Sequence, residues 1–203
     1  MRGWIWVGWL AAALLAGWCA RAEPKPGETG KKPANLALPA WKDLPGADGR
    51  KHSLDELKDK KAVLVIFFSN TCPDCAVYFD RIVAIAKEYE AKGVATILLN
   101  VSRAEEDDLQ HMIRFANEKR LACQYLYDHT QQLGKKLGAA VTPEAYLFNK
   151  QRKLTYAGAV DDHWKPEKVQ RRHLRIALDQ TLAGGKVEVP FSAAEGCDIV
   201  YEE

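Results

Sequence analysis

Residues 62–75 read AVLVIFFSNTCPDC, and this stretch decides the fold. Residues 62–68 are an unbroken run of apolar residues, most of them β-branched or aromatic. Such a run is typical of a strand buried on both faces in the middle of an α/β sheet. A polar turn then leads to Cys72 and Cys75, and Pro73 between them suits the first turn of a helix. The stretch therefore predicts a central strand, a pair of thiols and a helix, in that order.

A helix is expected to continue from these cysteines to Gly93, where glycine favours termination. Its apolar residues recur at helical spacing, as Phe79, Ile82, Val83, Ala86 and Tyr89. A second apolar run, VATILLNV at residues 94–101, predicts another buried strand. A further helix is marked by Leu109, Met112, Ile113 and Ala116. This alternation of strands and helices predicts a sheet with parallel members.

The remaining core segments are shorter. We predict a strand over 121–128, a short helix over 131–137 and a last helix over 166–182 that ends before Gly184. Two apolar pieces, AYLFN (145–149) and LTYAG (154–158), flank a polar turn and predict an antiparallel hairpin. Upstream, the turn residues 46–49 predict an N-terminal hairpin, and Ser53 is a candidate cap for a helical turn. The expected fold is a mixed central sheet flanked by helices, with an N-terminal hairpin extension.

The chain of 203 residues suits one domain with extensions. We assign residues 36–183 to that domain and residues 184–203 to a C-terminal tail that carries Cys197. Residues 23–35 are rich in proline, glycine and lysine, so we expect a flexible leader there.

Residues 1–22 have the three parts of a signal peptide: a charged start, an apolar middle and a small-residue exit. We predict cleavage after Ala22, and therefore a periplasmic or otherwise exported protein. The alternative is an uncleaved membrane anchor, although the run is shorter than the ~20 residues that span a bilayer. A lipid-attachment motif would have a small residue directly before its cysteine, but Trp18 precedes Cys19. We therefore do not expect Cys19 to be acylated.

The charge balance argues against some partners. Loss of Arg2 and Arg21 with the signal segment would leave 27 Lys and Arg against 27 Asp and Glu. A neutral surface gives no electrostatic reason to expect nucleic acid or an anionic membrane as partner.

Cys72 and Cys75 lie one helical turn apart at the start of a helix. Backbone N–H groups and the helix dipole stabilise a thiolate there, so we expect Cys72 to be the nucleophile and Cys75 the resolving thiol. Zinc would need a second Cys-x2-Cys or His-x3-His pair, which the sequence lacks. We therefore expect redox exchange, with no metal and no cofactor.

FFSNTCPDC after an apolar strand, followed about 70 residues later by VTPEAYLF, resembles the thioredoxin superfamily. The early hairpin is similar to its redoxin branch, which includes peroxiredoxins and exported thioredoxins. Gly196-Cys197-Asp198-Ile199 resembles the tail of a bacterial redoxin group. The resemblance implies a cis peptide bond between Thr142 and Pro143, which would form the platform that aligns a substrate strand.

Two residues depart from the thioredoxin pattern. Ile66 stands where that family has a buried aspartate, so a proton acceptor for Cys75 would have to come from elsewhere. Asp74 lies between the thiols, and its negative charge is expected to disfavour the thiolate and give a more reducing couple.

Other residues carry weaker signals. Cys123 is interpreted as a buried free thiol of the core. Cys197 is expected in a mobile tail, where it could resolve a mixed disulfide on Cys72, pair with Cys123 or bridge two chains. Asp161, Asp162 and His163 could form a metal or proton-transfer cluster, although such a run is more often a solvated loop.

The leading hypothesis is an extracytoplasmic thiol-disulfide oxidoreductase that acts on protein thiols and disulfides and is recharged by an unidentified electron donor. One alternative is a peroxiredoxin-type peroxidase with Cys72 as peroxidatic cysteine. Ser69 fits that motif, but Val65 replaces its proline. A second alternative is a copper-delivery protein on the same fold, which is disfavoured because Val141-Thr142-Pro143 lacks the histidine expected there.

Overall fold

The computed structural model describes residues 36–202. The expected signal peptide at 1–22 and the expected leader at 23–35 lie outside the described residues. No helix within 36–202 is both long enough and apolar enough to cross a membrane.

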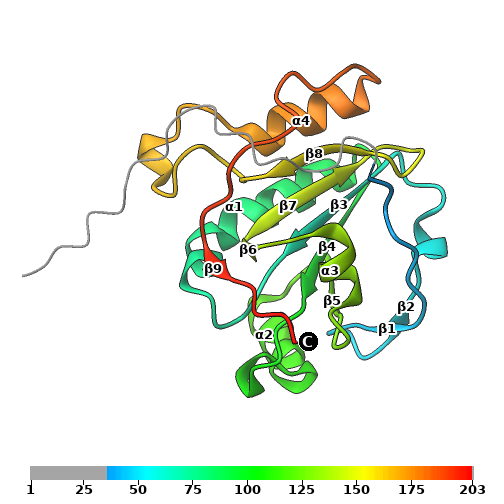
Figure 1. Cartoon of the computed structure of the whole chain (residues 1–203), viewed down its shortest axis with the longest axis vertical. Coiled ribbons are helices and arrows are strands. Elements are labelled where there is room, and N and C mark those ends of the chain that lie inside the picture. The colour runs from blue at the N-terminus through cyan, green and yellow to red at the C-terminus, as the bar shows by residue number, and fades with distance from the viewer. Residues whose placement is uncertain (1–35, 203) are drawn as a thin grey trace, which may run out of the picture.

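The described chain alternates strands and helices, as predicted (Figure 1). Its elements in chain order are β1 (Leu44–Pro45), β2 (Lys51–His52), the 3-10 turn η1 (Leu54–Leu57), β3 (Ala62–Phe67), α1 (Pro73–Glu90), β4 (Val94–Asn100), η2 (Glu105–Asp107), α2 (Leu109–Lys119), β5 (Gln124–Tyr127), α3 (Gln132–Leu137), β6 (Val141–Thr142), β7 (Glu144–Phe148), β8 (Leu154–Gly158), η3 (Pro166–Lys168), α4 (His173–Leu182) and β9 (Cys197–Asp198).

The core is a five-stranded sheet in the order β5-β4-β3-β7-β8. The central strand β3 runs parallel to β4 and antiparallel to β7, and β8 completes the predicted hairpin at one edge. The prediction of a mixed sheet flanked by helices, with an N-terminal hairpin formed by β1 and β2, is confirmed.

The two faces of β3 belong to different layers of the core. Leu64 and Ile66 face a cluster that includes residues of α1, α2 and α4, whereas Val63 and Val65 face residues of α3 and η1. Because successive side chains of a strand point to opposite faces, an all-apolar strand is what two covering layers require. Burial of each large apolar side chain contributes about 1.5–3 kcal/mol.

Helix α1 begins at the cysteine pair for local reasons. Cys72 is its N-cap residue and accepts a hydrogen bond from the Cys75 backbone N–H, while Pro73 occupies the first turn, where no N–H is needed. Ile82 and Ile85 lie on the buried face and are 0% and 1% exposed, so the helix is held against the sheet. Both cysteines therefore lie at the end of the sheet where the carboxyl end of β3 is found.

The prediction of one continuous helix over 166–182 is wrong. The segment forms η3 and, after a break, α4. The carboxylate of Asp162 accepts hydrogen bonds from the backbone N–H groups of Gln170 and Arg171, at 3.0 and 2.9 Å. Those groups are thus not available to a helical ladder, and the helix begins only at His173.

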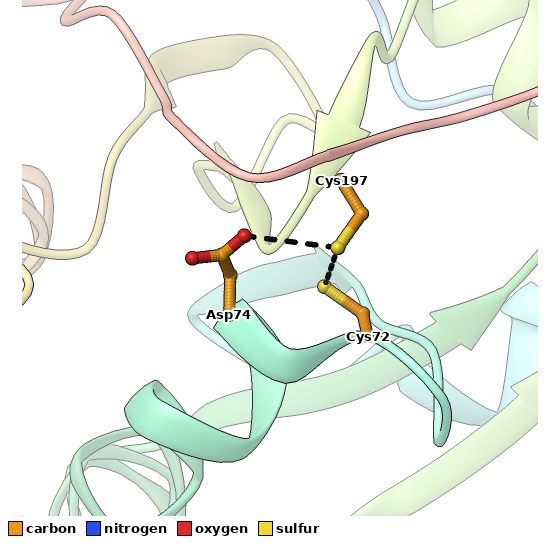
Figure 2. Close-up of side chains that lie close together, drawn as sticks. All are labelled: Cys72, Asp74 and Cys197. Atoms are coloured by element: carbon orange, nitrogen blue, oxygen red, sulfur yellow. Dashed lines mark hydrogen bonds between the residues drawn. The ribbon is translucent and has the colours of Figure 1, made fainter. Parts of the chain in front are cut away.

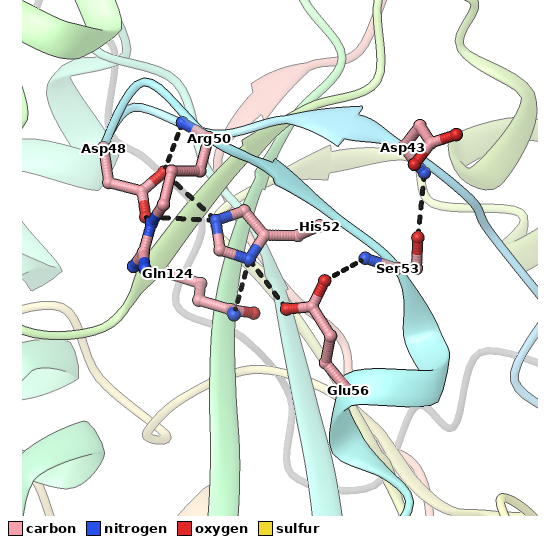
Figure 3. A network of polar contacts seen from close by, with 7 residues as sticks. All are labelled: Asp43, Asp48, Arg50, His52, Ser53, Glu56 and Gln124. Carbon is pink, nitrogen blue, oxygen red and sulfur yellow. Dashed lines mark hydrogen bonds and ion pairs between the residues drawn. The ribbon is translucent and has the colours of Figure 1, made fainter.

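The N-terminal hairpin contains a polar network around His52 (Figure 3). His52 is 6% exposed, and its ring nitrogens lie 3.0 Å from carboxylate oxygens of Asp48 and Glu56. Burial lowers the pKa of His52, but hydrogen bonds and charges from both carboxylates outweigh it, so the pKa is raised. Gln124 of β5 also reaches the ring and ties the hairpin to the sheet.

Candidate active site

Cys72 and Cys75 lie together at the start of α1, but they are not equivalent. The Cys72 side chain is 4% exposed and Cys75 is 0% exposed. All four cysteines among the described residues are present as thiols.

Several groups hydrogen-bond to the sulfur of Cys72. The backbone N–H of Cys75 donates to it at 3.3 Å, and the sulfur of Cys197 lies 2.7 Å away. The hydrogen bond with the Cys75 side chain lowers the pKa of Cys72, burial opposes it, and the hydrogen bond with Cys197 lowers it further, to about 5. The lowered pKa favours the thiolate of Cys72 at neutral pH, whereas the hydrogen bonds that Cys72 donates to Cys197 and Thr142 belong to its thiol form.

Cys75 has the opposite character. Burial raises its pKa, and the hydrogen bond with Cys72 and the charge of its thiolate raise it further. The Cys75 sulfur also accepts a 3.5 Å hydrogen bond from the backbone N–H of Ser69. One sulfur is thus prepared to attack, and the other keeps its proton until Cys72 has reacted.

The expected effect of Asp74 on the thiolate of Cys72 stays a prediction, because the groups that set the pKa of Cys72 are mainly the neighbouring thiols and burial. The carboxylate of Asp74 is instead 3.7 Å from the sulfur of Cys197 (Figure 2). Burial raises the pKa of Cys197 to about 12, aided by the hydrogen bond and charge of Cys72, whereas the backbone of Asp74 lowers it and the charge of its carboxylate raises it.

The peptide bond between Thr142 and Pro143 is cis, as the resemblance implied. The carbonyl oxygen of Thr142 accepts a 3.1 Å hydrogen bond from the sulfur of Cys72. The turn also contains a buried carboxylate that sequence reasoning missed, because Glu144 is 5% exposed and accepts a hydrogen bond from the Ala140 N–H. The cis-proline turn therefore lies against the cysteine pair.

The C-terminal tail is not the mobile segment that we expected. Residues 197–198 form β9, which pairs antiparallel with β6 so that Cys197 is opposite Thr142. Ile199 continues the pairing, because its N–H donates to the carbonyl of Ala140 at 2.8 Å. This backbone ladder brings the sulfur of Cys197 to that of Cys72.

The structure separates Cys123 from these thiols. It lies just before β5, partly buried against the core, and burial raises its pKa to about 12. This placement agrees with the interpretation of Cys123 as a core-packed free thiol, and it disfavours pairing of Cys123 with Cys197.

Ile66 is fully buried in β3, so that position supplies no carboxylate. Sequence reasoning missed Asp107, which is 1% exposed and holds the loop before the cysteines. It accepts hydrogen bonds of 2.7 Å from the Ser69 hydroxyl, 2.7 Å from the Asn70 N–H and 2.9 Å from the Thr71 hydroxyl. The signal was the acidic run at 105–108 after the second buried strand, because the carboxyl ends of parallel neighbours meet at one edge of the sheet.

The segment of Asp161, Asp162 and His163 has structural contacts. Asp161 is 6% exposed and forms a 2.8 Å ion pair with Arg81 of α1, which also donates to the carbonyl of His163. Asp162 caps the break before α4, and Nδ1 of His163 accepts from the backbone N–H of Lys165. These contacts favour the reading of a structural loop over that of a metal or proton-transfer cluster.

One group among the described residues has ligand atoms close enough for a metal. Atoms of Cys72, Asp74 and Cys197 lie within 4.8 Å of one another. Two thiolates on one tetrahedral zinc, each at about 2.3 Å, would be about 3.8 Å apart. The two sulfurs lie 2.7 Å apart, which is shorter than the separation in that arrangement.

Comparisons with known proteins agree with this geometry. The family model described as Redoxin matches residues 32–172. An uncharacterized conserved protein from Geobacillus kaustophilus is 31% identical, with a TM-score of 0.78 over 86% of this chain and 95% of that chain. A hypothetical protein from Sinorhizobium meliloti 1021 is 29% identical, with a TM-score of 0.77 over 84% of this chain and 96% of that chain.

A more distant structure shares the fold alone. It is a thiol:disulfide interchange protein of the thioredoxin family from Chlorobium tepidum TLS, 15% identical, with a TM-score of 0.57 over 73% of this chain and 97% of that chain. Among curated proteins, none matches the chain. These likenesses confirm the expected thioredoxin-like α/β fold.

Proposed function

Because the chain belongs to the Redoxin family of the thioredoxin superfamily, we propose that it is a thiol-disulfide oxidoreductase that works outside the cytoplasm on protein disulfides. Cys72 and Cys75 are its catalytic residues, and Thr142 and Pro143 form its substrate platform.

The reaction follows from the asymmetry of the two thiols. The Cys72 thiolate attacks one sulfur of a substrate disulfide, the substrate S–S bond breaks, and one substrate thiolate leaves. Cys75 then gives up its proton and attacks the Cys72 sulfur, which releases the second substrate thiol. Two electrons pass to the substrate, and a Cys72–Cys75 disulfide remains. A dithiol donor outside this chain must reduce that disulfide for the next cycle.

One observation carries the proposal. The sulfur of Cys72 has a pKa lowered to about 5 and lies 3.1 Å from the Thr142 carbonyl, beside the cis Pro143. A sulfur whose thiolate is favoured, placed beside a backbone edge, combines a nucleophile with a surface on which an extended peptide can align. Pro73 and Asp74 lie between the two cysteines in the first turn of α1, where Pro73 suits the start of the helix.

The proposed location rests on the sequence of residues 1–22, which has the pattern of an export signal. Exported proteins meet disulfides that persist, whereas the cytosol keeps thiols reduced. The proposed partners are therefore exported proteins with disulfides, together with the dithiol donor. A membrane tether would exist only if the N-terminal segment stayed uncleaved.

Reduction of the disulfides of insulin by dithiothreitol, followed as precipitation of the insulin B chain, tests the proposal. We expect the wild type to accelerate it, Cys72→Ser to abolish the acceleration and Cys75→Ser to reduce it strongly. Cys123→Ser is the matched control and should retain full activity. Equal activity of the wild type and Cys72→Ser would contradict the proposal.

One observation also favours a second candidate, reduction of peroxide. Cys72 lies beneath β9 with a side chain only 4% exposed, so a small oxidant reaches it more easily than a protein does. The thiolate would attack one oxygen of the peroxide, the O–O bond would break and hydroxide would leave, which gives a sulfenic acid at Cys72. A second thiol would then attack the sulfenic sulfur and form a disulfide with release of water. Consumption of hydrogen peroxide by the wild type, lost in Cys72→Ser, would support this candidate over the first if insulin is not reduced.

A further inference from the structure

The tail strand occupies the platform itself. β9 pairs antiparallel with β6, with Cys197 opposite Thr142 and Asp198 opposite Val141. An extended peptide that bound beside Pro143 by strand addition would use the same backbone groups of β6. The tail and a substrate strand therefore compete for one edge.

The fit of the tail to this edge is close. A Cβ atom at Gly196 would lie 2.0 Å from the carbonyl oxygen of Thr142, so any side chain at this position would push β9 away from the platform. Beyond β9, the side-chain amide of Gln131 donates to the carbonyl of Val200 and accepts from the N–H of Glu202, both at 2.9 Å. These two bonds hold the tail on the C-terminal side of Cys197.

The fit also places a sulfur at the reacting atom. The sulfur of Cys197 lies 2.7 Å from that of Cys72, beside the carboxylate of Asp74 (Figure 2). A disulfide bond is ~2.05 Å long. The two sulfurs are therefore in contact, and a bond between them can form by exchange with an existing disulfide.

We propose that Cys197 is a third exchange thiol of this site, which β9 presents to Cys72 as a built-in substrate strand. The proposal rests on the proposed function of Cys72 and Cys75. Starting from the Cys72–Cys75 disulfide, the Cys197 thiolate attacks the sulfur of Cys72. The Cys72–Cys75 bond breaks as the Cys72–Cys197 bond forms. Cys75 leaves as a thiolate and takes up a proton equivalent to the one that Cys197 lost, so no external oxidant or reductant is needed.

This exchange regulates access to the platform. A Cys72–Cys197 disulfide fixes β9 on β6 and excludes any protein that binds as a strand. Reduction of that disulfide leaves β9 held by noncovalent contacts, and its backbone hydrogen bonds to β6 are ones that an incoming extended peptide can replace. The substrate class is therefore narrowed to polypeptides with an extended segment next to the disulfide.

Non-reducing peptide mapping tests the proposal. The wild type is equilibrated with oxidised and reduced glutathione, quenched with acid, alkylated and digested. We expect both the Cys72–Cys75 and the Cys72–Cys197 peptides. In Gly196→Ala the Cys72–Cys197 peptide should fall several-fold although Cys197 is present. Gly185→Ala is the matched control, because a Cβ there would meet only the carbonyl oxygen of Gln180 at an ordinary 3.7 Å.

A wild-type map with Cys72–Cys75 as the only disulfide would overturn the proposal. This test uses the wild type alone, so it does not depend on the folding of any variant. An unchanged Cys72–Cys197 yield in Gly196→Ala would overturn the role given to β9. Insulin reduction by the same samples separates the two claims. Activity without the Cys72–Cys197 peptide overturns only this inference, whereas the peptide without activity supports it and overturns the proposed function.

Discussion

The carboxylate of Asp107 accepts a 2.7 Å hydrogen bond from the hydroxyl of Ser69, 38 residues earlier in the chain. Together with its bonds to Asn70 and Thr71, this contact fixes the loop that joins the central strand to the reactive cysteines. The loop in turn aims the Ser69 N–H at the sulfur of Cys75. A buried acid in a neighbouring loop thus positions the thiols without touching them.

Asp107→Ala should lower the free energy of unfolding by about 3 kcal/mol, because it leaves several buried donors without an acceptor. Urea unfolding measures the change. Glu106→Ala is the matched control, since Glu106 is exposed and its loss should cost less than about 0.5 kcal/mol. A loss in Asp107→Ala no larger than in the control would contradict the role assigned to this carboxylate.

The alkylation of Cys72 should be nearly independent of pH above pH 6. Its pKa is lowered to about 5, so the thiolate is already the main form there. A thiol with the ordinary pKa of about 8.5 would instead react roughly tenfold faster for each pH unit up to pH 8. Iodoacetamide labelling followed by mass spectrometry gives the rate at each cysteine. Cys123, whose pKa is raised to about 12, is the internal control and should keep accelerating throughout.

His52 should stabilise the protein more at pH 5.5 than at pH 9. Its pKa is raised in the folded state, so its contribution is complete below the unfolded pKa of about 6.5 and is lost as the pH rises through the folded value. The unfolding free energy of the wild type minus that of His52→Asn, from urea titrations, should therefore shrink between these two pH values. His129→Asn, at an exposed position, is the control. A difference that grew with pH would show that the neutral ring is the stabilising form.

Arg81→Met should destabilise the protein by about 3 kcal/mol, because Asp161 is buried and would lose its ion-pair partner. The folded variant should keep full activity towards insulin. Lys92→Met, which removes a more exposed ion pair with Glu88, is the control and should change stability by less than about 1 kcal/mol. Loss of activity without loss of stability would instead indicate that the segment at 161–163 has a functional role.

Much of the fold could be predicted because the deciding signals are local. The apolar run predicts the buried strand β3, and the proline after Cys72 predicts the start of α1. The polar turn between β7 and β8 predicts their hairpin. The last helix was predicted too long because its interruption depends on Asp162, whose carboxylate captures backbone N–H groups eight and nine residues away. Such a contact leaves no periodic signature in the sequence.

The cysteine pair and the cis proline could also be predicted, since spacing and family resemblance both point to them. The rest of the site could not. Asp107 lies in an acidic run that reads as solvated surface until the parallel pairing of β3 and β4 brings it to the loop. Cys197 reads as part of a mobile tail, and only the pairing of β9 with β6 places it at Cys72.

The most direct test of the central claim is the trapping of a mixed disulfide on Cys72. The variant Cys75→Ser/Cys197→Ser lacks both thiols that could resolve such an intermediate. After incubation with a protein substrate that contains a disulfide, non-reducing electrophoresis and peptide mapping should show a covalent complex joined through Cys72. Absence of a complex, or a complex joined only through Cys123, would contradict the account.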